Sequence, residues 1–142
     1  MSKRIRVFEA PGGEAATLPI EPSMWHSERS AYIPLDHWLL ILEFVREIMP
    51  GKADFLENMT FGSYKYNYYL NLSKSEQTSI IDLLYSVQDK LRNSPSILSL
   101  KDRVDDFYDE FENEEYCKMI EAVIAVYEEA RRLQSPVCVY ND

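Results

Sequence analysis

The chain has few of the residues that build common catalytic, metal-binding or disulfide-stabilised sites. It contains two cysteines, two histidines and four glycines among 142 residues. Cys117 and Cys138 form no CxxC pattern, and no glycine-rich phosphate loop, GxSxG motif or HExxH motif occurs. No apolar run approaches the roughly 20 residues that a membrane span requires. The sequence therefore predicts no catalytic residue, no cofactor, no metal site and no membrane-spanning segment.

The N-terminal residues and the cysteines give an expectation about location. Residues 1–13 contain basic side chains but no apolar run after them, so they do not resemble a secretory signal. Two cysteines without a disulfide framework are typical of a reducing compartment. We therefore expect a cytoplasmic protein.

Length and composition predict one globular domain that spans residues 1–142. Hydrophobic residues at 46% and charged residues at 27% are usual for a soluble globular chain. A chain of this size buries roughly 68–70% of its unfolded surface and needs no disulfide or metal to fold. The formal net charge is −9. So acidic a surface repels nucleic acid and anionic membranes and favours basic proteins.

Helical periodicity predicts a mainly α (α+β) fold with about four helices. Apolar residues at helical spacing mark a helix at about 35–49, in which Trp38 begins a wide apolar face. Ser73 and Glu76 form a capping-box pattern that opens a second helix, ending near residue 93. A third helix is expected at about 96–111, with Phe107 and Phe111 facing inward. Asn113 is expected to cap a fourth helix at about 114–133.

Three short segments predict a small strand element. Residues 4–8 and 64–72 alternate with period two, and residues 137–140 follow a proline and are rich in valine. Residues 9–34 contain four prolines and no periodicity. We interpret 9–34 as a long irregular loop or arm, because structureless segments of this length usually serve binding.

The strongest functional signal is an uncompensated acidic run. Residues 105–115 contain seven acids and no base, and such carboxylates must stay hydrated or meet positive charge. Asp105, Asp106 and Asp109 also spell the DDxxD pattern with which isoprenoid synthases hold magnesium. Those enzymes have a much longer helical chain and a second metal motif, which this sequence lacks. We expect the acids to form a solvated face or a partner-binding surface, and no metal site.

Clustered tyrosines are the second signal. Tyr64, Tyr66 and Tyr68 would lie on one face of the expected strand and Tyr69 on the other. The first three fit a hydrophobic core or an interface equally well, because tyrosine is enriched at protein contacts. Tyr69 is the better candidate for exposure.

The histidines and Cys117 fit structural roles. His37 has Leu40 and Ile41 where a second metal ligand would be required, so we expect a packed or helix-end histidine. Cys117 flanks an apolar helical face and is expected to be a small core residue. A histidine-based enzyme would require His26 or His37 to meet Cys117 or a carboxylate in one cleft.

In overall character, a small, acidic, cytoplasmic chain without catalytic motifs resembles the bacterial immunity proteins that inhibit a cognate toxin. The resemblance implies a binding protein that neutralises a basic partner, such as a nuclease, by charge and shape. It implies neither nucleic acid nor membrane as a partner. A phage or plasmid protein that mimics nucleic-acid charge belongs to the same class, and the alternatives are a small enzyme or a homodimeric adaptor. The predicted contact residues are Asp105, Asp106, Asp109, Glu110, Glu112, Glu114, Glu115 and Tyr69.

Overall fold

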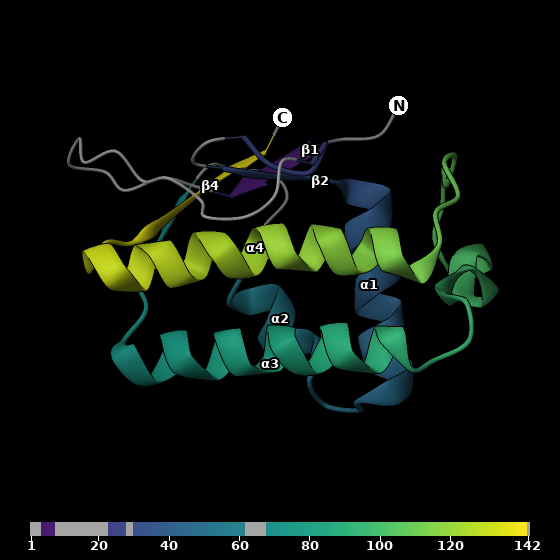
Figure 1. Ribbon diagram of the computed structural model, residues 1–142, viewed down its shortest axis with the longest axis horizontal. Coiled ribbons are helices and arrows are strands. Elements are labelled where there is room, and N and C mark those ends of the chain that lie inside the picture. The colour runs from purple at the N-terminus through teal and green to yellow at the C-terminus, as the bar shows by residue number, and fades with distance from the viewer. Residues whose placement is uncertain (1–3, 8–22, 28–29, 62–67, 142) are drawn as a thin grey trace.

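Two long antiparallel helices lie side by side in the computed structural model, which describes residues 4–7, 23–27, 30–61 and 68–141 (Figure 1). The helices are α3 (Lys74–Arg92) and α4 (Asn113–Leu133). Helix α1 (Leu35–Ile48) crosses this pair and is followed by the short helix α2 (Ala53–Asn58). The 3-10 helix η1 (Ile97–Arg103) lies in the connection from α3 to α4.

A four-stranded antiparallel sheet covers α4 on the side away from α3 (Figure 1). Its strands are β1 (Arg4–Val7), β2 (Ala31–Pro34), β3 (Tyr68–Leu70) and β4 (Val137–Asn141). The strand order is β2-β1-β4-β3, so both chain ends of the described fold meet in the two central strands. Helix α4 contacts both the sheet and α3, and most of its side chains are buried.

The buried core draws side chains from all of these layers. Trp38 is fully buried on α1, and its ring meets that of Phe61 edge to face with centroids 4.5 Å apart. Tyr127 of α4 donates a 2.5 Å hydrogen bond from its hydroxyl to the carbonyl oxygen of Met59. Aromatic packing and one buried hydrogen bond thus fix the chain after α2 against the central helix.

The mainly helical class with a small strand element is confirmed. The expected helices at 35–49, 73–92 and 114–133 correspond to α1, α3 and α4. The capping box of α3 is formed in both directions between Ser73 and Glu76. Strands β1 and β4 occupy the segments expected at 4–8 and 137–140, and β3 lies within 64–72, of which residues 64–67 are outside the described part.

The helix expected at 96–111 is wrong. Only η1 is helical, and the chain leaves it at Val104, which is extended with φ −119° and ψ 125°. Asp106 then adopts a left-handed conformation with φ 56°, and residues 107–112 form no helix. Closely spaced carboxylates repel one another on a helix, and aspartate has a low helix propensity. Phe107 and Phe111 are still partly buried against the core. The prediction of their inward position is therefore correct, and the prediction of a helical backbone is wrong.

The interpretation of 9–34 as irregular is wrong at its C-terminal end. Residues 31–34 form β2, which pairs with β1 in the register Ile5↔Ile33. Trp25 and Ile33 are buried in the core, and an isolated bridge joins His26 to Ala31. Four residues are too few to show a period, and β1 supplies the partner from a distant part of the sequence. Residues 8–22 and 28–29 are outside the described residues.

Asn113 does not cap α4 as expected. The N-cap residue is Glu112, and the side chain of Asn113 turns back to the α3–η1 connection. Its Oδ1 accepts a 2.8 Å hydrogen bond from the backbone N–H of Ile97, and its Nδ2 donates to the carbonyl oxygens of Leu91, Ser94 and Pro95. One side chain therefore bonds backbone groups of both the end of α3 and the start of η1 and joins the two segments.

Candidate partner-binding site at the acidic loop

Residues 105–112, the acidic loop, precede α4 at the end of the α3/α4 pair where α3 finishes (Figure 1). The exposed acids of the loop are Asp105, Asp106, Asp109, Glu110 and Glu112. Tyr108 is 62% exposed among them. The loop thus presents carboxylates and one large aromatic ring to the solvent on the same segment.

An aromatic cluster holds the acidic loop on the core. It consists of Trp25, His37, Phe107, Phe111 and Tyr116. The ring of His37 lies 5.3 Å from that of Phe107 and 5.1 Å from that of Phe111, measured between centroids. Edge-to-face contacts at such distances add to the burial energy of the rings. Two inward phenylalanines therefore anchor a segment whose other side chains are mostly charged.

His37 is the centre of this cluster and is almost completely buried. Its Nδ1 lies 2.9 Å from the hydroxyl oxygen of Tyr116, and its backbone N–H donates a 2.9 Å hydrogen bond to Oδ1 of Asp36. Burial lowers the pKa of His37, although the charges of Asp36 and Asp109 act in the opposite direction. Burial also raises the pKa of Tyr116. Both shifts favour the neutral forms of the imidazole and the phenol at pH 7.

Polar contacts tie two of the acids to the rest of the fold. Glu115 accepts a 2.5 Å hydrogen bond from Nε1 of Trp25 and lies 3.4 Å from Nζ of Lys118. Glu110 forms an ion pair with Lys101 of η1. Glu110 and Glu115 thus have contacts within the fold, and no partner protein is needed to account for their positions. The remaining acids of the run, Asp105, Asp106, Asp109, Glu112 and Glu114, form no ion pair with any described residue.

The structure brings together all seven acids that the sequence singled out. The loop carries five of them, and Glu114 and Glu115 follow in the first turn of α4. Tyr69 lies elsewhere: β3 pairs it with Cys138, just after the opposite end of α4. A helix of 21 residues is roughly 30 Å long, so Tyr69 is far from the loop. Its side chain is outside the described part of the structure, and its expected exposure stays a prediction.

Tyr108 is the surface residue that sequence reasoning missed. The helix expected at 96–111 includes Tyr108, and on such a helix Tyr108 would lie among the solvent-facing acids with nothing to single it out. The signal was its place directly after Phe107, which packs against the core while the adjacent Tyr108 is exposed.

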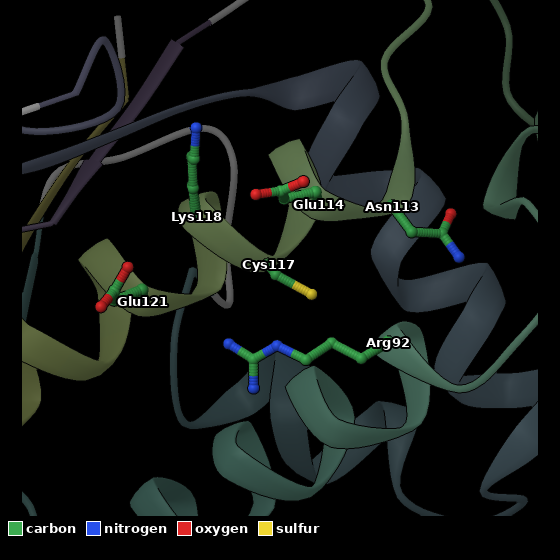
Figure 2. A pocket seen from close by; sticks show the side chains of 6 residues that line it. All are labelled: Arg92, Asn113, Glu114, Cys117, Lys118 and Glu121. Carbon is green, nitrogen blue, oxygen red and sulfur yellow. The ribbon is translucent and has the colours of Figure 1, made fainter.

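The histidine–cysteine arrangement of the enzyme alternative is not formed. A pocket of about 450 Å³ contains Cys117, but no histidine lines it among the described residues (Figure 2). The thiol is buried, donates toward the carbonyl oxygen of Gln88 at 3.5 Å and has a pKa raised by burial. A buried thiol with a raised pKa is a poor nucleophile. The expectation that Cys117 is a core residue is confirmed, and so is the expectation that His37 is packed in the interior.

Within residues 4–7, 23–27, 30–61 and 68–141, no three His, Cys, Asp or Glu side chains are grouped so that they could hold a metal ion. No helix in this part of the chain combines the length and apolar character needed to cross a bilayer.

Comparisons with protein families, with characterised proteins and with solved structures found no match to this chain.

Proposed function

We propose that this chain is a cytoplasmic binding protein that neutralises a basic protein partner, and specifically an immunity protein that inhibits a cognate toxin. The observation that carries the proposal is the acidic loop, in which unpaired carboxylates and the exposed Tyr108 stand on a buried aromatic anchor. A nuclease is the favoured toxin, since enzymes that act on nucleic acid present basic surfaces to phosphates.

The anchored loop supports binding because much of its ordering is complete before a partner arrives. Phe107 and Phe111 fix the loop at two points four residues apart, and the Lys101–Glu110 ion pair adds a third. Less conformational entropy is then lost on association, so more of the contact energy is available as affinity. The same loop without its anchors would have to be ordered by the partner.

Charge and shape have separate tasks in this proposal. The unpaired acids attract lysine and arginine side chains over several ångströms and raise the rate of encounter. Tyr108 offers a large ring with a polar tip, which is typical of residues that dominate the energy of an interface. Charges at the rim would therefore set the association rate, and Tyr108 would set the lifetime of the complex.

Site-specific photo-cross-linking tests the proposed surface. A photoreactive residue at Tyr108 should capture a basic protein in the native cells, whereas the same residue at Tyr85, which is 48% exposed on α3, should not. The captured protein should arrest growth when it is expressed alone. Co-expression of the wild-type chain should relieve that arrest, and a variant with Tyr108→Ala should relieve it less. Equal capture from Tyr85, or a captured protein without a basic surface, would contradict the proposal.

A further inference from the structure

A second concave site lies at the other end of the α3/α4 pair. It has a volume of about 400 Å³ and lies between the start of α3 and the end of α4. Among the side chains that line it are Leu72, Lys74, Thr78, Arg131, Gln134 and Ser135. The acidic loop precedes the first turn of α4, and this cavity is at its last turn, so the two sites are separated by roughly 30 Å.

The charge of this cavity is opposite to that of the chain. Lys74 and Arg131 line it, no acid does so among the described residues, and neither cation forms an ion pair with a described residue. The pocket of about 450 Å³ beside Cys117 provides a contrast, because there Arg92 and Lys118 are matched by Glu114 and Glu121 (Figure 2). The chain as a whole has a net charge of −9, so the two cations of this cavity are opposite in sign to the charge of the molecule.

Both walls of the cavity are held by defined helix ends. Ser73 and Glu76 form the reciprocal capping box at the start of α3. At the end of α4, Gln134 adopts a left-handed conformation with φ 53°, and the N–H of Ser135 donates a 2.9 Å hydrogen bond to the carbonyl oxygen of Ala130. These caps fix the backbone from which the cavity side chains extend. The two cations are thus presented from opposite walls.

We propose that this cavity binds the phosphate group of a small phosphate monoester. The arginine fork matches two phosphate oxygens, and a lysine ammonium neutralises the second negative charge. The hydroxyl of Thr78 and the amide of Gln134 are further neutral donors. The partly buried Leu72 gives the organic part an apolar contact, and the volume lies in the usual range for small-molecule sites. The proposal is independent of the proposed function of the acidic loop.

Amide NMR titration of the full chain at constant ionic strength tests this site with phenyl phosphate, inorganic phosphate and benzoate. Phenyl phosphate should bind in a saturable way and shift the amides of residues 74–78 and 134–135. Lys74→Gln and Arg131→Gln should each weaken its affinity by about tenfold, the effect of losing a charged hydrogen bond. Lys90→Gln removes an exposed cation of α3 that lies outside the cavity. It should leave the affinity for phenyl phosphate unchanged. Benzoate, with one negative charge, should bind more weakly than phenyl phosphate.

Three results would overturn the assignment. The first is the absence of saturation by phenyl phosphate up to about 10 mM. The second is an equal loss of affinity in Lys90→Gln, which would show attraction by net charge without a defined site. The third is sedimentation in which the wild-type chain self-associates and Arg131→Gln does not, because the carboxylates of a second copy would then fill the cavity. Folding of each variant is checked by its amide spectrum before titration.

Discussion

The imidazole Nδ1 of His37 lies 2.9 Å from the phenol oxygen of Tyr116, and this hydrogen bond joins α1 to α4 beneath the acidic loop. The rings of Phe107 and Phe111 rest on the same imidazole. A buried, neutral histidine therefore supports the most highly charged segment of the described chain. The packing of the loop therefore depends on this buried histidine.

Replacement of His37 should change how stability depends on pH. Burial lowers the pKa of His37 in the folded protein below its unfolded value of about 6.5, so the unfolded chain takes up the proton first. The contribution of His37 to the free energy of unfolding is complete above about pH 6.5 and decreases as the pH falls below it. This contribution is absent in His37→Gln. Its free energy of unfolding in urea should therefore fall less between about pH 7.5 and pH 5.5 than that of the wild-type protein.

His26→Gln is the matched control for this measurement, because His26 lies outside the aromatic cluster. It should retain the pH dependence of the wild-type protein. If His37→Gln and the wild-type protein lose the same free energy of unfolding on acidification, His37 does not carry the effect.

Trp38 should be among the most costly core residues to truncate. It is fully buried and packs against Phe61, so Trp38→Ala should lower the free energy of unfolding by roughly 3–5 kcal/mol. Trp38→Phe should cost only about 1 kcal/mol, because it retains a ring and the indole N–H has no hydrogen-bond partner in the described structure. Urea unfolding of both variants checks the pair, and a loss below about 1 kcal/mol in Trp38→Ala would show that α1 is packed differently.

Asn113 should stabilise the connection from α3 to η1. Asn113→Ala removes one acceptor and the donors to three carbonyl groups, so the free energy of unfolding should fall by about 1–3 kcal/mol. Asn93→Ala is the control, since its exposed amide makes a single local hydrogen bond to Asp89. Denaturation curves that give equal losses for the two variants would argue against a special role of Asn113.

Neutralisation of the loop should act on the rate of association. The variant Asp105→Asn, Asp106→Asn and Asp109→Asn should bind the partner about tenfold or more slowly at low salt. Dissociation should change less, because exposed rim charges affect encounter more than the lifetime of a complex. Stopped-flow measurements at low and physiological salt give both rates. An association rate that is the same for the variant and the wild-type protein at both salt concentrations would remove these acids from the mechanism.

The DDxxD pattern should not create a tight magnesium site. In the structure Asp105 and Asp109 are exposed on an irregular loop and do not share a helix face. Calorimetry with magnesium or manganese should show no sub-micromolar binding to the whole chain. Tight binding that Asp105→Asn with Asp109→Asn abolishes would reverse this interpretation.

Sequence patterns alone identified the long helices and the acidic run. The apolar spacing around Trp38 and the Ser73–Glu76 capping box are local signals, because the residues that form them lie within a few turns of one another. The charge run likewise needs no distant partner to be recognised. The inward positions of Phe107 and Phe111 were also predicted correctly, although the helix expected to carry them does not form.

Tertiary structure alone decided the rest. Strand β2 exists because β1 lies beside it, and the side chain of Asn113 leaves its expected cap because the α3–η1 connection brings backbone carbonyl groups within its reach. The aromatic cluster joins Trp25, His37 and Tyr116 from three distant parts of the chain, and the cavity between Lys74 and Arg131 requires the antiparallel helix pair. Each of these features depends on contacts between residues far apart in sequence, which no local period or propensity encodes.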